Sequence, residues 1–265
     1  MRWQPLVILF FCATSLLAPI LATENPMRTN LNAQLQPPGA SHLLGTDVLG
    51  RDVFSRLLHG GRRTLLIASI ATFTAVMVGG LLGLASGITN EFGNLILSGI
   101  ITMLLAFPTL LVALVVLTIL GIGPLSLALA TGFSQIGAFG RISRTTAIRV
   151  RSQLYMESGY AIGATRWHMF RFYIFPNAQA ALTSYAAITF SYCLLNSTTL
   201  SFLGLGGEPG VPDWGVMLAE SRVALSEAPW LGIVPGLAIT IVVWAIISWV
   251  NQGDVATFQS ATGSN

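Results

Sequence analysis

Six apolar stretches, each close to the length of a membrane-spanning helix, constrain the fold of this chain more than any other feature. About 20 apolar residues cross the hydrocarbon core of a bilayer as a helix, and backbone groups inside lipid must hydrogen-bond to one another. The stretches are too long and too uniformly apolar for the alternating strands of a barrel. The sequence therefore predicts an all-α, polytopic membrane protein with about six transmembrane helices, at roughly 6–22, 64–88, 94–120, 124–140, 178–204 and 231–250.

Composition restricts how such a protein could work. Only 9% of the residues are charged and 53% are hydrophobic, unlike a soluble domain. The chain has no lysine, so a P-loop of the form GxxxxGK[ST] is impossible. The interiors of the six stretches contain no Asp, Glu, Arg or His, which disfavours ion-coupled carriers. No Ser/His or paired-Asp constellation lies at membrane depth, so we expect no enzyme and an external source of energy.

The first stretch has two interpretations. Arg2 precedes it and Ala22 lies near its end, as in a cleaved signal peptide. The residue three positions before a cut after Ala22 is Ile20, which is not small, so a retained signal anchor fits better. Cys12 lies behind two phenylalanines and is a poor lipoprotein site, and with Cys193 as the other cysteine no disulfide framework is indicated.

Arginines indicate the orientation in the membrane. The loop 141–177 holds six arginines against the single acid Glu157, which marks it as cytoplasmic and puts both termini inside. The loop 23–63 then lies outside although it holds five arginines; long loops follow the positive-inside rule weakly.

Two spacing patterns occur within the stretches. Gly79, Gly80, Gly83 and Gly87 place small residues at helical spacing, where a neighbouring helix can approach closely. In the fifth stretch five polar residues form one stripe along a helix, either as interhelical hydrogen-bonding groups or as the lining of a substrate pathway. These residues are Tyr185, Thr189, Tyr192, Asn196 and Thr199.

The loop 141–177 predicts a short helix, a turn and a second helix. Glu157 suits the positive end of a helix dipole, Gly163 can end that helix, and Pro176 leads into the next span. The segment offers side chains to a groove on a partner; alternatively, it is an interfacial loop whose aromatics lie at the headgroups. The side chains in question are Tyr155, Met156, Tyr160 and Ile162.

Two outer segments also carry polar residues. In 46–63, Thr46 or Asp47 can cap a helix and Asp52 and Arg56 form an i,i+4 pair, which favours a structural brace over direct contact with substrate. The loop 207–230 is long for a connection and rich in contact-forming residue types. These are Glu208, Asp213, Trp214, Glu220, Arg222 and Glu227.

Several motifs carry a resemblance to a known family. Residues Tyr155–Thr165 and Ile174–Asn177 resemble the EAA loop of ABC-importer permeases. Five further segments resemble, in the same order, the C-type permeases of the oligopeptide/dipeptide/nickel family. They are Leu44–Arg56, Leu105–Pro108, Leu200–Gly206, Trp214–Glu220 and Ala228–Trp230.

The resemblance implies a MetI-like ABC permease fold and a set of partners. A B-type permease would complete a heterodimer, two ABC ATPase subunits would hydrolyse ATP, and a periplasmic or lipid-anchored solute-binding protein would deliver substrate. The chain itself would hold no cofactor and no metal, contact membrane lipid but no nucleic acid, and lie as a multi-pass protein in a bacterial or archaeal cytoplasmic (inner) membrane.

The resemblance also assigns roles to residues. ATPase coupling falls to the cytoplasmic EAA loop, where Ser158 and Gly159 replace the family's two alanines and Phe175 replaces a leucine; serine and glycine weaken a helix relative to alanine. Binding-protein contact falls to the loop 207–230. The coupling residues are Tyr155, Glu157, Ser158, Gly159, Gly163 and Pro176, the pathway residues are the polar stripe, and the docking residues are Asp213, Trp214, Glu220 and Arg222.

We therefore expect a permease subunit for di- or oligopeptides, organised as an N-terminal anchor helix and external loop (1–63), a transmembrane domain (64–250) and a disordered polar tail (251–265). Serine at position 197, where peptide-transporting members often have an acidic residue, leaves nickel or another small solute as an alternative substrate. An alternative of another class is a membrane channel or scaffold without an ATPase, whose arginine-rich loop binds anionic lipid.

Overall fold

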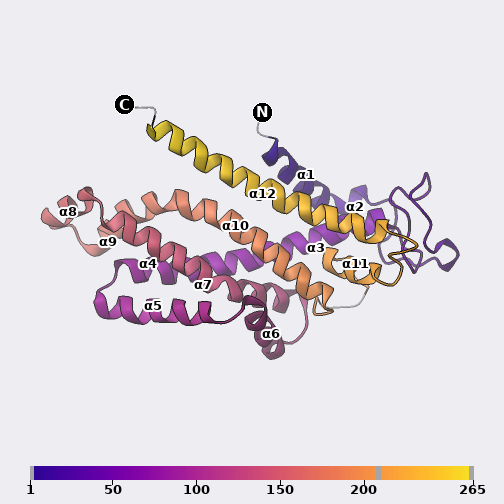
Figure 1. The fold of residues 1–265 in the computed structure, drawn as a ribbon, viewed down its shortest axis with the longest axis horizontal. Coiled ribbons are helices and arrows are strands. Elements are labelled where there is room, and N and C mark those ends of the chain that lie inside the picture. Colours follow the sequence, from indigo (N-terminus) through magenta and orange to yellow (C-terminus); the bar gives the residue numbers. More distant parts are fainter. Residues whose placement is uncertain (1–2, 207–209, 263–265) are drawn as a thin grey trace. The chain divides into compact units, whose positions relative to one another are not determined.

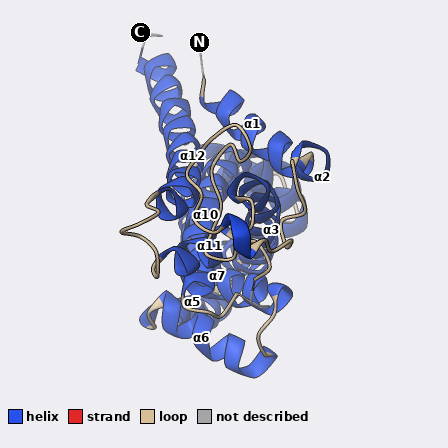
Figure 2. Cartoon of the chain, turned by 90° about the vertical axis from the view of Figure 1, so that its right-hand side faces the viewer, coloured by secondary structure: helices blue, strands red, loops and turns tan. Residues whose placement is uncertain are grey.

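The computed structural model describes residues 3–206 and 210–262. Among these residues it is helical, with loops and one isolated bridge between Thr46 and Asp52 in place of any sheet (Figure 2). The predicted all-α fold is confirmed. Glu208 of the predicted docking loop and residues 263–265 lie outside the described residues.

The helices follow one another in the order shown by the colours of Figure 1. Their bounds are α1 Gln4–Leu16, α2 Ala18–Leu21, the 3₁₀ turn η1 Leu31–Ala33, α3 Val53–Thr74, the π-turn η2 Ala75–Gly79, α4 Gly80–Ile88, α5 Glu91–Ala106, α6 Thr109–Leu120, α7 Pro124–Arg151, α8 Leu154–Ala161, α9 Arg166–Met169, the π-turn η3 Phe170–Ile174, α10 Phe175–Phe202, α11 Trp214–Ser221 and α12 Trp230–Thr262.

The chain forms two compact units. The first comprises residues 1–69, 120–128 and 191–265, and the second comprises 70–119 and 129–190. Helices α3, α7 and α10 each contribute residues to both units.

The structure bears on the number of spans. Among the described residues, two helical segments are long and apolar enough to cross a membrane, Val53–Ile88 and Trp230–Gln252, and a third is added if the bent pair α5–α6 counts as one span. Helices α7 and α10 have 28 residues each, but polar residues along them lower their hydropathy. Membrane-spanning helices are therefore confirmed, while six as their number stays a prediction.

The predicted single helix at 94–120 is wrong. Helices α5 and α6 are separate and are bent by 94° relative to each other. The break lies at Phe107, whose φ of −99° and ψ of 141° are extended. Pro108 explains it, because a proline ring disfavours the helical conformation of the residue before it and supplies no amide donor.

Close helix packing explains the glycines of the second unit. A Cβ atom on Gly79 would lie 2.6 Å from the carbonyl oxygen of Ile136, and one on Gly87 would lie 2.5 Å from the Cβ of Ala147. Gly83 meets the backbone of Gly140 in the same way. The end of η2 and α4 therefore touch α7 backbone to backbone, as their spacing predicts.

Helix α1 packs along α12 in the first unit (Figure 1). The rings of Trp3 and Trp244 are 4.7 Å apart. Cys12 is exposed and Cys193 is buried, and the two form no disulfide with each other. The expected disordered tail from Asn251 is wrong for the described residues, because α12 continues to Thr262.

Candidate functional site

The EAA-like segment folds as the predicted helix, turn and second helix. Glu157 lies in the first turn of α8. Beyond the end of α8, Gly163 adopts a φ of +84°, and the amide of Ala164 donates to the carbonyl of Gly159 at 3.1 Å, the pattern of a Schellman cap. Helix α9 begins at Arg166, and Thr165 caps it because its side chain accepts a hydrogen bond from the amide of His168.

Among the side chains of α8 that the structure describes, one is buried against the body of the second unit. Met156 is 0% exposed, whereas Glu157 and Ser158 beside it are exposed. Its thioether belongs to an apolar cluster drawn from α4, α7, α8, α9, η3 and α10. The members are Leu84, Ala147, Val150, Met156, Met169, Ile174 and Ala178.

Gly159 has a packing role that its helix propensity does not suggest. It is buried, and a Cβ at this position would lie 2.5 Å from the Cε and 2.7 Å from the Sδ of Met169. The glycine thus makes room for the α9 methionine in the apolar cluster. Ser158 has no such contact, and its hydroxyl donates to the carbonyl of Leu154 at 3.3 Å.

The outward side of the hairpin combines polar and apolar groups. Tyr155 is 40% exposed and stacks on Tyr173, with ring centroids 6.2 Å apart. Leu154 and Ile162 are about four-fifths exposed, at 80% and 83%. Pro176 is also exposed, and the π-turn η3 directly precedes the helix that contains it, so α9, η3 and α10 form one helical run.

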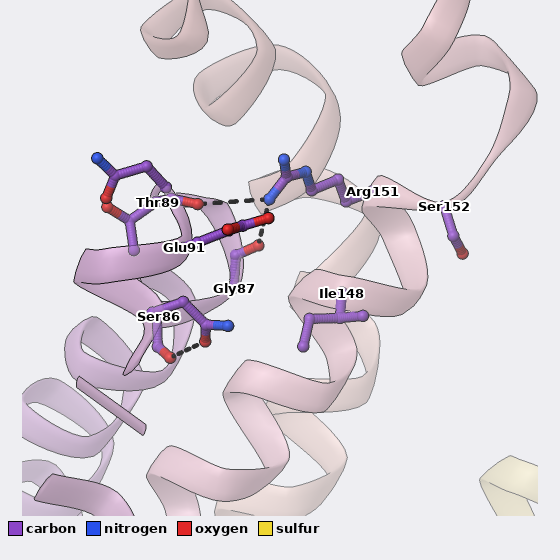
Figure 3. Close-up of a pocket in the computed structure, with 9 residues that line it drawn as sticks. Ser86, Gly87, Thr89, Glu91, Ile148, Arg151 and Ser152 are labelled. Carbon is purple, nitrogen blue, oxygen red and sulfur yellow. Dashed lines mark hydrogen bonds between the residues drawn. The ribbon is translucent and has the colours of Figure 1, made fainter. Parts of the chain in front are cut away.

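Two arginines of α7 bind groups on α4 and α5, and Figure 3 shows one of them, Arg151, with its acceptors at the end of α4. Arg151 donates to the carbonyls of Gly87 at 3.4 Å and Thr89 at 3.5 Å, where a cation compensates the free carbonyls at the end of α4. About two turns earlier in α7, Arg144 donates to Ser86 at 3.2 Å and to Asn94 at 3.1 Å. From the sequence these arginines indicate only the orientation, because their partners lie 50 or more residues away in the chain.

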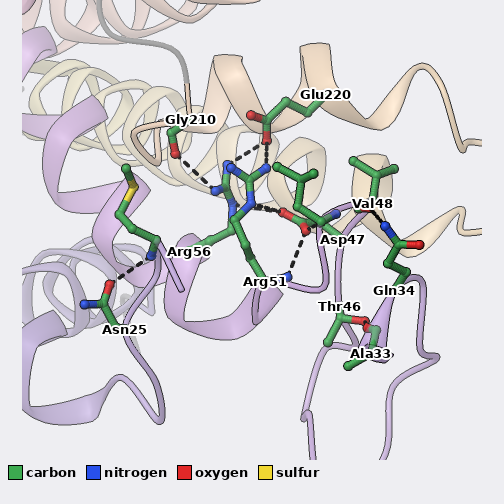
Figure 4. Close-up of polar contacts among 12 residues, drawn as sticks. Asn25, Ala33, Gln34, Thr46, Asp47, Val48, Arg51, Arg56, Gly210 and Glu220 are labelled. Carbon is green, nitrogen blue, oxygen red and sulfur yellow. Dashed lines mark hydrogen bonds and ion pairs between the residues drawn. The ribbon is translucent and has the colours of Figure 1, made fainter. Parts of the chain in front are cut away.

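The outer part of the first unit contains a buried ion network (Figure 4). Arg51 donates to Asp47 at 2.6 Å and to Glu220 at 2.8 Å. Arg56 donates to the same Glu220 oxygen at 2.6 Å and to the carbonyl of Gly210 at 3.2 Å. Both arginines are buried and Glu220 is 28% exposed, so residues 47–56 are joined to α11 through one carboxylate.

This network corrects two predictions. Arg56 pairs with Glu220 and, at 3.5 Å, with Asp47 rather than with Asp52. The residue that caps α3 is Asp52, whose carboxylate accepts from the amide of Ser55 at 2.8 Å, and not Thr46 or Asp47. The expected role of the segment as a structural brace agrees with these contacts.

Hydrogen bonds hold the Asp52 carboxylate in its charged form. Burial by itself would raise the pKa of Asp52, but donors from Ser55, His42 and Thr23 outweigh that effect and lower the pKa. His42 Nδ1 lies 3.0 Å from one carboxylate oxygen, and the Thr23 hydroxyl donates to the other at 3.1 Å.

Asp213 and Trp214 are buried, at 2% and 1% exposure, and their contact with a binding protein stays a prediction. The Asp213 carboxylate caps α11 by accepting from the amides of Gly215 and Val216. Burial raises the pKa of Asp213, although these hydrogen bonds and the charge of Arg63 act in the opposite direction. The indole of Trp214 donates to the carbonyl of Leu57 at 2.9 Å.

Two members of the predicted docking set have accessible side chains. Glu220 is partly exposed at the edge of the ion network. Arg222 is exposed and lies over the ring of Phe202, with 4.4 Å between its Cζ atom and the ring centroid.

The residues of the polar stripe on α10 differ in how far their side chains are exposed. Thr189 is buried and its hydroxyl donates to the carbonyl of Tyr185, and Thr199 donates likewise to Leu195. Tyr192 is 53% exposed and Asn196 is partly buried. Both threonine hydroxyls thus donate their hydrogen bonds to carbonyls of the same helix.

The described residues thus combine apolar helices long enough to cross a membrane with a helical hairpin, α8–α9, between the long helices α7 and α10. The chain belongs to the family of binding-protein-dependent transport system inner membrane components, whose pattern matches residues 79–252. The predictions of a permease, rather than an enzyme, and of a multi-pass inner-membrane location are therefore confirmed.

Curated relatives narrow the class to C-type permeases. The chain is 33% identical to a dipeptide transport system permease protein, DppC, of Alkalihalophilus pseudofirmus, over 90% of this chain and 78% of that protein. It is 36% identical to the di/tripeptide transport system permease protein DppC of Pseudomonas aeruginosa, over 91% and 81%. A glutathione transport system permease protein, GsiD, of Pectobacterium atrosepticum is 35% identical over 78% and 69%.

Solved structures agree with the predicted fold. The MetNI methionine ABC transporter in inward-facing form superposes with a TM-score of 0.61 at 18% identity, over 77% of this chain and 96% of that chain. An amino acid ABC transporter gives a TM-score of 0.60 at 15% identity, over 77% and 94%.

Proposed function

We propose that this chain forms, together with a second permease of B type, the translocation path of an ABC importer for di- or oligopeptides. The names of its relatives, which refer to dipeptides, tripeptides and glutathione, support this class of substrate. The chain holds no cofactor in this proposal, and two separate ATPase subunits hydrolyse ATP.

The burial of Met156 is the observation that carries the coupling role. An ATPase that pushes on the exposed side of α8 acts on a helix whose other side packs in the same apolar cluster as Leu84 and Ala178. Side chains in such a cluster are close-packed and transmit displacement rather than absorb it. Movement of α8 would therefore be passed to α4, α7 and α10.

The hydrogen bonds of Arg151 also support the transmission of movement from α8 to α4 and α7. Arg151 ends α7 only three residues before α8 begins, and it bonds the carbonyls at the end of α4. A displacement of the hairpin would consequently move α4 and α7 together. Rigid-body motion of this kind is a common way to alternate access in transporters.

For the path and the docking surface, we propose the residues that remain accessible. Tyr192 and Asn196 on α10 present polar groups that a peptide backbone could bind. The Ser197 side chain is neutral and buried, and its hydroxyl donates to the carbonyl of Leu194. Glu220 and Arg222 would contact the solute-binding protein.

Uptake of a labelled dipeptide by proteoliposomes tests the proposal, with the chain reconstituted beside the permease and ATPase subunits with which it co-purifies. We expect ATP-dependent uptake that requires the binding protein and that is strongly reduced by Glu157→Ala. Glu91→Ala is the matched control, because Glu91 is another exposed acid of the same unit, at the start of α5.

Each outcome has a defined meaning. Uptake of nickel but not of dipeptide would refute the peptide substrate and retain the importer. A chain that purifies without permease or ATPase partners, from membranes in which other importers remain assembled, would refute the importer itself.

A further inference from the structure

A second feature of the second unit is an apolar groove between α4 and the start of the helical run α9–η3. Its volume is about 450 Å³, within the range of roughly 300–1,000 Å³ that is usual for ligand sites. Both helices that form it lie at the end of the unit that carries α8 (Figure 1). The lining residues are Leu81, Leu84, Ala85, Ile88, Thr89, Arg166, Trp167 and Phe170.

The wall on α4 belongs to a membrane span. Leu81, Ala85 and Ile88 fall in the last two turns of the span Val53–Ile88, and Ile88 is its final residue. Leu81 is 62% exposed. A groove whose wall lies within the hydrocarbon zone is open to lipid tails, so its natural occupant is an apolar chain from the bilayer.

The other wall carries a cation and an aromatic ring, the combination typical of a membrane interface. Trp167 is 70% exposed and packs on Phe170 with ring centroids 5.6 Å apart. Arg166 is exposed, and in the described parts of the chain it takes part in no ion pair. Trp and Arg beside the end of a span commonly meet lipid headgroups.

The charge around the groove selects the type of headgroup. Within residues 141–177, six arginines stand against the single acid Glu157. An excess of this size attracts the anionic lipids of a cytoplasmic leaflet, whereas a zwitterionic headgroup brings a compensating cation.

We propose that this groove binds one anionic phospholipid, with an acyl chain along α4 and the phosphate at Arg166. The lipid then joins α4 to α9, whose Met169 lies in the apolar cluster that holds α8. The site does not depend on which substrate is transported.

Native mass spectrometry of the purified permease complex, titrated with phosphatidylglycerol or phosphatidylcholine, tests the proposal. We expect preferential retention of phosphatidylglycerol, and about fivefold weaker retention in Arg166→Gln, since one arginine near an anionic surface contributes roughly 1 kcal/mol. Arg171→Gln is the control, because it removes an equal charge from the same loop without touching the groove.

A second variant tests the acyl part of the site. Ala85→Phe fills the groove from α4 without a change of charge and should lower retention of phosphatidylglycerol, with unchanged thermal stability of the complex. Equal losses in Arg166→Gln and Arg171→Gln would show diffuse attraction to the loop and overturn the proposal. Brominated phosphatidylglycerol in the groove should quench the fluorescence of Trp167. Loss of this quenching when the ATPase subunits assemble would also overturn the proposal, because the ATPase would then occupy the groove.

Discussion

Replacement of Met156 by alanine is the most direct test of how α8 is attached. The side chain is 0% exposed, and removing a buried methionine to alanine costs about 2–5 kcal/mol. Helix α8 has 8 residues, well below the roughly 12–15 that an isolated helix needs in water, and Ser158 and Gly159 weaken it further. Its order therefore depends on this anchor, and Met156→Ala should unfold α8 locally while the rest of the unit stays folded.

Hydrogen–deuterium exchange of the complex in nanodiscs measures the effect. A loss of 2 kcal/mol corresponds to about a 30-fold increase in the exchange of amides in α8. Leu154→Ala is the matched control, because it shortens an apolar side chain of the same helix that is 80% exposed. Unchanged exchange in Met156→Ala, or an equal increase in Leu154→Ala, would refute the attachment of α8 through this residue.

Three further predictions concern the turn after α8 and the outer segment. Gly163→Ala should destabilise the turn by about 1–2 kcal/mol and reduce transport-coupled ATPase activity, because a φ of +84° strains an L residue even though no atom lies within 4 Å of the new Cβ. Gly163→Asn should recover much of the lost activity, because asparagine tolerates this conformation. Equal ATPase activity in the alanine and asparagine variants would contradict the role of backbone strain. Because the pKa of Asp52 is lowered in the folded state, its charge stabilises the protein above the ordinary pKa of about 3.9, and this stabilisation is lost as the pH falls through the lower folded-state pKa. The thermal midpoint in detergent, measured against pH, should therefore change less in Asp52→Asn. An equal pH dependence in both proteins would show that another group is responsible. Glu220→Gln should leave the buried guanidinium groups of Arg51 and Arg56 with less negative charge beside them and lower the free energy of unfolding by roughly 3–5 kcal/mol. Proteolysis within residues 23–52 should then be faster, whereas Glu227→Gln should leave the rate of proteolysis unchanged.

Local patterns predict the coupling hairpin well, because the groups that form it are close in sequence. Glu157 at the helix start and Gly163 beyond its end act within one or two turns of α8. The glycines of α4 likewise predict close helix packing before their partner is known. In contrast, Gly159 is read from sequence only as a weak helix former, and the space it leaves for Met169 follows from folding.

Long-range contacts account for the predictions that failed. The caps and ion pairs of 46–56 were assigned from neighbours within four residues, yet Arg56 bonds to Glu220, 164 residues away. Asp213 and Trp214 are contact-forming residue types in a long loop, but hydrogen bonds with Thr64 and Leu57 on α3 hold both in a buried position. The break at Phe107 is different, because Pro108 beside it is a local cause, and the apolar residues on both sides made the segment resemble one continuous span.

Sequence alone determined that this chain is a helical membrane protein that lacks a P-loop, because hydrophobicity and the absence of lysine can be read from each position separately. It also indicated the family and the helix, turn and helix around Glu157, since short motifs fix local backbone geometry. Only the tertiary structure decided which side of α8 is buried, which arginines are structural and which polar residues remain accessible. These properties depend on contacts between residues far apart in the chain, and no local pattern encodes them.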